Sequence, residues 1–128
     1  MRITDSAISL NVPDPEASAA FVTEHFGFQV AMQADGFVSL RREDAGFHLI
    51  FLRVGLSTFK PPSHADAVSG GLLVAFIVDA IDQEYTRLRD AGVRIVTPIE
   101  TEPWGERYFQ VADPNDVIFQ LVQWVAEP

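Results

Sequence analysis

The sequence repeats itself, and this repeat limits the possible folds more than any other feature. Residues 37–54 overlay residues 107–124 when moved by 70 positions, so that FHLIFLRV falls on VIFQLVQW. Residues 7–12, AISLNV, overlay LVAFIV at residues 73–78 when moved by 66 positions. A repeat of this kind governs the fold, because each copy forms the same supersecondary unit.

The second copy ends in the signature of a β-hairpin. Two apolar runs, residues 107–112 and 117–124, flank the sequence DPND at 113–116, whose residue types favour turns. Alternate residues of the second run form two faces, and both faces are largely apolar. We therefore expect a strand that is covered by a helix on one side and lines a cavity on the other, with Gln120 as a polar side chain near the middle of the cavity face.

Each copy also carries the signature of one helix. Asp14 and Pro15 suit the start of a helix that ends at Gly27, and residues 81–91 have helical periodicity. Strands are predicted at residues 3–12, 28–32, 37–41, 47–54, 71–79, 93–96, 107–112 and 117–124. Residues 97–105 lead into the last hairpin, with Trp104 in a loop that enters a strand. The predicted fold class is α+β: two tandem βαβββ modules, at residues 1–54 and 71–128, joined by a linker loop at 55–70 in one compact domain overall.

Composition excludes several classes of function. A formal net charge of −9 argues against binding a nucleic-acid backbone and would attract cationic partners. The chain has no cysteine, so disulfides and thiolate metal sites are excluded. No apolar run approaches ~20 residues and no long apolar signal core begins the sequence. We expect a cytoplasmic protein that does not bind membranes.

Three segments, LNVPDPEASAAFVTEHFGF, GGLLVAFIVDAID and PWGERYFQVADPNDV, resemble the vicinal oxygen chelate superfamily. This superfamily includes glyoxalase I, extradiol dioxygenases, fosfomycin-resistance enzymes and bleomycin-resistance proteins. The resemblance covers essentially the whole chain. It implies that each module curls into half a barrel, that two modules enclose a cavity, and that two chains form a homodimer, often by exchanging modules. The usual DPNG turn is DPND here, with Asp116 in place of glycine, which puts the local turn geometry in question.

The resemblance also indicates where metal ligands would lie. Metal-dependent members place His, Glu or Gln at four inward positions on the first and last strands of the modules. Carried over by motif, these positions fall on Ala7, Ile50, Leu73 and Gln120. Three of these side chains have no donor atom and an amide is a weak ligand, so we expect neither a metal nor another cofactor. The Lewis acid of glyoxalase or dioxygenase chemistry would then be missing.

Without a metal, the inward faces predict a mostly apolar cavity for a flat, partly aromatic small molecule. Ser9, Asn11 and Gln120 would orient it by hydrogen bonds, Trp104 would stack on it, and Phe59 in the linker would close over it. The candidate ligand-binding residues are Ser9, Asn11, His48, Ile50, Phe59, Leu73, Ala75, Trp104, Tyr108, Gln110, Ile118, Gln120 and Val122.

Several candidates also have a structural interpretation. His48 is as well explained as a structural or rim histidine, Trp104 as a cap over the edge of the core, and Phe59 as part of a dimer contact. Arg107 would pair with an acidic group of a ligand, with Glu106 or with Asp113.

Three functions follow. The first is a non-catalytic binding protein, like the bleomycin-resistance proteins, that confers antibiotic self-resistance by sequestering an aromatic or hydrophobic natural product, such as a DNA-damaging antibiotic, in a dimer-interface pocket. The second is a glyoxalase-like or dioxygenase-like metalloenzyme with a displaced metal site on His48, Gln120 and Glu43 or Glu106. The third is a metal-free isomerase or cyclase with acid-base catalysis from His48.

Overall fold

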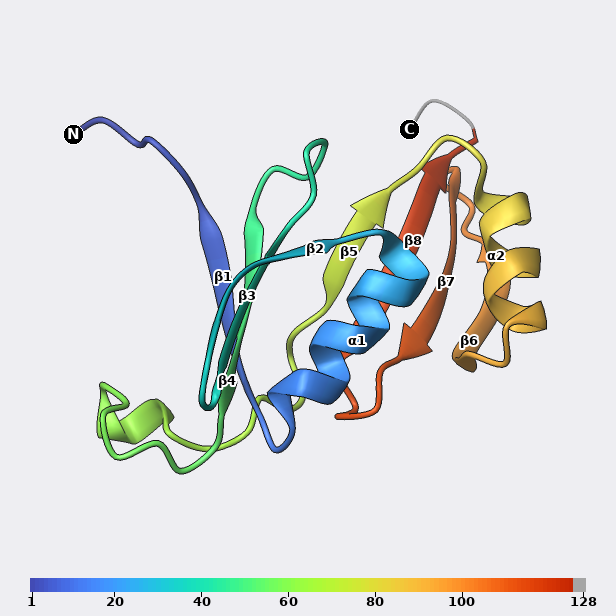
Figure 1. Cartoon of the computed structure of the whole chain (residues 1–128). Helices are drawn as coiled ribbons and strands as arrows, with labels where there is room; N and C mark the ends of the chain where they lie inside the picture. Colours follow the sequence, from blue (N-terminus) through green and yellow to red (C-terminus); the bar gives the residue numbers. More distant parts are fainter. Residues whose placement is uncertain (126–128) are drawn as a thin grey trace. The chain divides into compact units, whose positions relative to one another are not determined.

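The computed structural model describes residues 1–125, which form two four-stranded mixed sheets with two α-helices (Figure 1). The chain divides into two compact units, residues 1–68 and the part from Ser69 onward. Their strand orders are equivalent, β1-β4-β3-β2 and β5-β8-β7-β6, which confirms the α+β fold of tandem βαβββ modules. The boundaries 1–54, 55–70 and 71–128 stay a prediction, and the last range reaches into residues 126–128, outside the described part.

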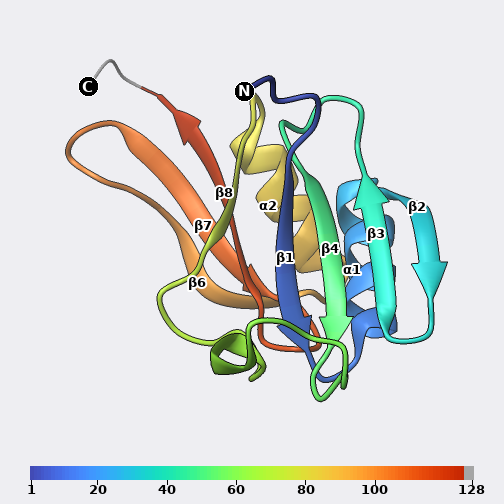
Figure 2. The same ribbon diagram turned by 90° about the vertical axis from the view of Figure 1, so that its left-hand side faces the viewer.

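The first unit is one sheet with a helix along one face (Figure 2). Its elements are β1 (Ala7–Val12), α1 (Pro15–Phe26), β2 (Gln29–Ala34), β3 (Phe37–Arg41), β4 (His48–Arg53) and a short 3₁₀ helix, η1 (Pro62–His64). The Asp14 side chain accepts a hydrogen bond from the Ala17 N–H at 3.2 Å, and Gly27 ends α1 in the left-handed conformation at φ 70°. Both predicted helix limits are therefore confirmed.

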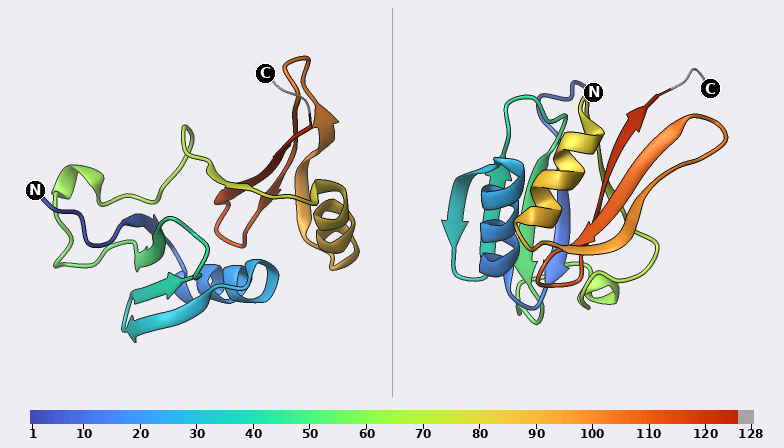
Figure 3. Two further views of the ribbon diagram at one scale, coloured as in Figure 1. Left: turned by 90° about the horizontal axis from the view of Figure 1, so that it is seen from above. Right: turned by 90° about the vertical axis from the view of Figure 1, so that its right-hand side faces the viewer.

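The second unit repeats this arrangement (Figure 3). Its elements are β5 (Val74–Ile77), α2 (Ile81–Asp90), β6 (Arg94–Thr101), β7 (Glu106–Ala112) and β8 (Ile118–Trp124). The strand predicted at 93–96 is too short, because β6 continues to Thr101 and Thr97 pairs with Gln110. Pro98 lies within β6, which is an edge strand whose register shifts between Thr97 and Glu100, so the missing N–H is tolerated.

Strand register confirms the repeat in the parallel strand pair of each sheet. Ile8 lies opposite Leu49 in the parallel β1–β4 pair, and Val74 lies opposite Phe119 in the parallel β5–β8 pair, which satisfies both shifts. The third strand departs from the shift of 70. Ser39 faces Ile50, whereas Gln110 faces Gln120, so β3 matches β7 at a shift of 71. The turn between β3 and β4 is one residue longer than the turn between β7 and β8. Because successive side chains of a strand point to opposite faces, a shift of 70 would match each side chain of β3 with one on the opposite face of β7.

Alternate strand residues form the core of each unit. Leu10 and Val12 of β1 are buried, and so are Phe51 of β4 and Phe119 of β8. Phe47 and Phe76 are only half-buried. Among the described residues no helix has the length and apolar character needed to cross a membrane.

The DPND turn keeps the backbone conformation that a glycine would favour. Asp116 has φ 62°, in the left-handed region, and its N–H donates to the Asp113 carbonyl at 3.0 Å. The Asp113 carboxylate accepts hydrogen bonds from the N–H groups of Asn115 at 2.8 Å and Val117 at 2.9 Å. Aspartate is among the residues that tolerate this conformation, so the substitution leaves the hairpin intact.

Candidate functional site

The first unit contains a pocket of about 810 Å³ between its sheet and the linker loop. β1 and β4 supply one side of it and the loop supplies the other. The lining residues are Ser9, Asn11, Leu52, Leu56, Thr58, Phe59, Lys60, Pro61, Ser63, His64, Asp66, Ala67 and Val68. Three of the predicted ligand-binding residues, Ser9, Asn11 and Phe59, are thus brought together.

Asn11 holds the loop against the sheet. Its side-chain amide donates to the main-chain carbonyl of His64 at 2.8 Å and to that of Asp66 at 3.4 Å. The main-chain carbonyl of Asn11 accepts from the Val68 N–H at 2.8 Å. The residue is only 9% exposed. Because its N–H donors are engaged by the loop, Asn11 positions the pocket wall, whereas the sequence suggested a direct hydrogen bond to a ligand.

The pocket combines apolar surface with a few charged groups. Leu52, Leu56 and Phe59 are half-buried, so each presents part of its side chain to the pocket. Lys60 and His64 are exposed on the loop, and the Ser63 hydroxyl lies 3.0 Å from Nδ1 of the His64 ring. This combination of apolar walls and a few polar groups is typical of sites for small organic molecules.

His48 and Ile50 do not line this pocket, although β4 carries both of them. His48 begins the strand opposite Ala7, and its Nε2 lies 2.9 Å from a carboxylate oxygen of Asp5, with 21% of the side chain exposed. Ile50 is half-buried opposite Ser9. The contact between the His48 ring and the Asp5 carboxylate agrees with the interpretation of His48 as a structural residue.

In the second unit, three polar side chains connect neighbouring strands on one sheet face. Gln110 Nε2 donates to Gln120 Oε1 at 2.7 Å, and the Thr97 hydroxyl donates to Gln110 Oε1 at 2.6 Å. The chain of hydrogen bonds therefore runs from β6 through β7 to β8. The predicted residues Gln110 and Gln120 are close together, and each uses its carbonyl oxygen within this chain.

Tyr108 lies on the same side of β7 as Gln110 and contacts two carboxylates. Its hydroxyl is 2.8 Å from a side-chain oxygen of Glu100 and 2.8 Å from one of Glu102. These two hydrogen bonds, with Glu100 contributing most, raise the pKa of Tyr108 above its ordinary value. A single hydroxyl hydrogen serves one acceptor at a time, so Tyr108 remains a neutral donor shared between the two.

The other predicted residues of this unit differ in accessibility. Leu73 is 50% exposed, Ala75 is exposed and Ile118 is half-buried, whereas Val122 is only 4% exposed and offers little surface to a ligand. Trp104, in the turn between β6 and β7, is 52% exposed. That exposure does not fit the alternative interpretation of Trp104 as a cap over the core.

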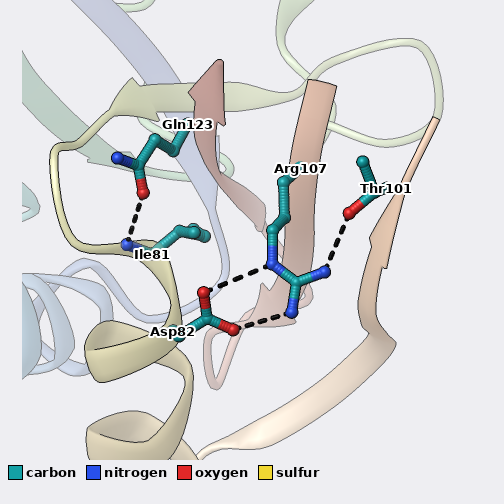
Figure 4. A network of polar contacts seen from close by, with 5 residues as sticks. All are labelled: Ile81, Asp82, Thr101, Arg107 and Gln123. Carbon is teal, nitrogen blue, oxygen red and sulfur yellow. Dashed lines mark hydrogen bonds and ion pairs between the residues drawn. The ribbon is translucent and has the colours of Figure 1, made fainter. Parts of the chain in front are cut away.

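Arg107 fastens the start of α2 to the sheet (Figure 4). It donates to both carboxylate oxygens of Asp82, the shorter distance being 2.7 Å, and to the Thr101 hydroxyl at 2.8 Å. The hydrogen bond from Arg107 lowers the pKa of Asp82. Nearby, Gln123 Oε1 accepts from the Ile81 N–H at 3.1 Å. The expected partners Glu106 and Asp113 were wrong. Arg107 lies opposite Gln123 in the β7–β8 register, on the helix-facing side of the sheet, and its guanidinium therefore meets Asp82 of α2.

The donor set at the four metal-ligand positions does not fit a divalent ion. Ala7, Ile50 and Leu73 have hydrocarbon side chains, and Gln120 Oε1 already accepts from Gln110. Within residues 1–125, no group of three or more His, Cys, Asp or Glu side chains could hold a metal ion.

The sequence did not identify Leu56, Lys60 and His64 as part of a pocket. Lys60 is the only lysine of the chain and precedes two prolines in the long linker, which was the available signal. These residues share a surface only when the loop is folded against the sheet. Hydrogen bonds between the loop and Asn11, which is distant in sequence, hold it there.

Comparisons with known proteins agree with this architecture. A family model described as "Glyoxalase/Bleomycin resistance protein/Dioxygenase superfamily" matches residues 6–121. A crystal structure of a glyoxalase/bleomycin resistance protein/dioxygenase from Nocardioides is 26% identical at a TM-score of 0.81, covering 100% of this chain and 89% of that chain. The structure of TioX from Micromonospora sp. ML1 shares the fold at 21% identity and a TM-score of 0.70, covering 95% and 99% of the two chains.

Two further similarities are less extensive in sequence. A lactoylglutathione lyase structure from Agrobacterium tumefaciens shares the fold at 16% identity and a TM-score of 0.75, covering 95% of this chain and 94% of that chain. The uncharacterized protein Mb0911c of Mycobacterium bovis is 40% identical over 50 residues, which are 39% of this chain. That match spans 33% of the relative's length.

Proposed function

The chain belongs to the glyoxalase/bleomycin resistance protein/dioxygenase superfamily, and from this premise we propose that it is a non-catalytic protein that sequesters an aromatic or hydrophobic natural product. Antibiotic self-resistance then results from a lower concentration of free drug, with no bond made or broken. We include a cytoplasmic location, where a DNA-damaging drug acts, and a homodimer in this proposal. Sedimentation velocity measures the oligomeric state.

The pocket of the first unit is the observation that carries the proposal. Its volume of about 810 Å³ lies within the range of about 300–1,000 Å³ of small-molecule sites. Leu52, Leu56 and Phe59 supply apolar surface, and burying apolar ligand surface contributes about 25 cal/mol per Å². Such a pocket binds by burial and stacking, which is what a sequestering protein requires.

The residues at the four metal-ligand positions support binding in preference to metal-dependent chemistry. Three of them, Ala7, Ile50 and Leu73, bring only hydrocarbon into positions where metal-dependent members bring donor atoms. Protein purified without chelator is expected to contain much less than one metal ion per chain, and added EDTA should leave ligand affinity unchanged. Elemental analysis measures this. Stoichiometric metal that is lost in Gln120→Leu would support the metalloenzyme with a displaced site instead.

Phe59 gives the direct test of binding. We expect an aromatic antibiotic that binds the wild-type protein to bind Phe59→Ala about tenfold more weakly, because aromatic stacking and buried apolar area are both lost. Isothermal titration with a panel of aromatic antibiotics measures the affinity, and amide NMR shifts are expected within residues 9–68. Phe59→Trp, in a Trp104→Phe, Trp124→Phe background, is the matched control, since it keeps an aromatic ring and reports binding by fluorescence.

Recovery of each compound unchanged after incubation would agree with sequestration. No binding to any compound of the panel by folded protein would count against the proposal. A changed compound would favour the metal-free isomerase or cyclase. The observation behind that second candidate is the 2.9 Å contact of His48 with Asp5, since an imidazole oriented by a carboxylate is a frequent general base. Turnover that disappears in His48→Gln would establish it.

A further inference from the structure

The pocket of the first unit differs in charge from the rest of the chain. The chain has a formal net charge of −9, yet the pocket lining contains its only lysine, Lys60, together with His64. Asp66 is the one acidic residue of that lining. An anion is therefore less strongly repelled at this pocket than elsewhere on the chain.

Lys60 is also available for an incoming anion. Six of the arginines form ion pairs with aspartate or glutamate side chains, and their charges are thereby already compensated. Lys60 takes part in no ion pair within residues 1–125, and its side chain is exposed. A lysine ammonium has three N–H donors and no acceptor, so its preferred partner is an anionic oxygen.

The structure fixes the position of the second polar group. The carbonyl of His64 accepts the hydrogen bond from the buried Asn11 side chain, which ties η1 to β1. The Ser63 hydroxyl lies 3.0 Å from Nδ1 of His64. When this hydroxyl donates to Nδ1, the ring hydrogen is on Nε2, and Nε2 is a donor toward a ligand.

From these observations we propose that the pocket takes an aromatic compound that carries one carboxylate. Lys60 and His64 receive the carboxylate, and Leu52, Leu56 and Phe59 cover the aromatic part. One ammonium, with Asp66 in the same lining, matches a single negative charge better than a doubly charged phosphate. This inference rests on the proposed binding function and names its ligand class. It also separates the pocket from the surface as a whole, whose charge favours cations.

A matched pair of compounds tests the inference on the full chain. Cinnamate and cinnamamide have the same aromatic body and differ in the charged group. Isothermal titration is expected to show cinnamate binding about twofold to fivefold more tightly, the effect of one solvent-accessible charge contact. The preference should shrink in high salt, because exposed charges are screened.

Variants then assign the preference to Lys60. Lys60→Gln should bind both compounds equally, and Lys60→Arg should keep most of the preference. Arg41→Gln is the control for net charge, since Arg41 is an exposed residue at the end of β3 that the pocket lining does not include. It is expected to behave as the wild type.

Several results would overturn the inference. Equal affinity of the wild type for both compounds would do so while leaving the binding function intact, as would a preference that survives in Lys60→Gln. Displacement of cinnamate by inorganic phosphate would assign the site to a bare anion. If aromatic antibiotics bind and neither cinnamate nor cinnamamide does, only the ligand class fails. If no aromatic compound binds, the proposed function fails with it.

Discussion

Replacing Asp113 with alanine is expected to lower the free energy of unfolding by about 2–4 kcal/mol. The residue is 3% exposed, and its carboxylate accepts hydrogen bonds from the main-chain N–H groups of Asn115 and Val117. Alanine leaves both donors without this acceptor, at the turn that joins β7 to β8. Urea denaturation followed by circular dichroism measures the change.

Two substitutions in the same turn are the controls. Asp113→Asn retains one carbonyl oxygen and should cost less than alanine. Asp116→Gly places a glycine at a left-handed position, which is favourable, but it also removes the ion pair of Asp116 with Arg94 at 2.6 Å, which is unfavourable. Because the two effects oppose each other, the free energy of unfolding should change by no more than about 1 kcal/mol. Equal denaturation midpoints for Asp113→Ala and Asp116→Gly would contradict this account of the hairpin.

The substitution Asn11→Asp is expected to weaken ligand binding at least tenfold and to lower stability by about 2–3 kcal/mol. The two side chains are nearly equal in size, but aspartate replaces the amide donors with oxygens that face the carbonyls of His64 and Asp66. The linker should then leave the sheet. Limited proteolysis of residues 55–68 and isothermal titration measure the two effects.

Ser9→Ala is the matched control for Asn11. Ser9 lies on the same face of β1 and lines the same pocket, so the variant samples the pocket without releasing the loop. Its affinity is expected to stay within about threefold of the wild type. Wild-type affinity and wild-type protease resistance in Asn11→Asp would show that the loop does not depend on this side chain.

Local signals explain why the sequence predicted so much of the fold. Asp14 and Gly27 limit α1 through contacts within a few residues, and the DPND turn is a local structure of the same kind. The repeat then predicted two modules with the same succession of helix and strands, because two copies of one sequence fold alike. What it missed was one extra residue before β4. The residue places β3 on β7 at a shift of 71, so that buried Val38 and Leu40 match buried Phe109 and Val111.

The pocket depends on contacts between distant residues, which composition and spacing do not reveal. Asn11 and His64 are 53 positions apart, and nothing near Asn11 in sequence indicates that its amide meets the linker. Arg107 and Asp82 are 25 positions apart, so the choice among acidic partners was open until the fold was known. Residue types predicted a ligand site, whereas three-dimensional neighbours decided which side chains belong to it.

In each sheet the strand that is synthesised last occupies an interior place. β1 has only β4 as a hydrogen-bonded neighbour, and β5 has only β8. On the ribosome, residues 74–77 must therefore wait without a pairing partner until residues 118–124 have been made. Through that interval the nascent half exposes unpaired strand edges that other chains can join. A chain that ends before residue 118 is consequently expected to leave β5 without its strand partner.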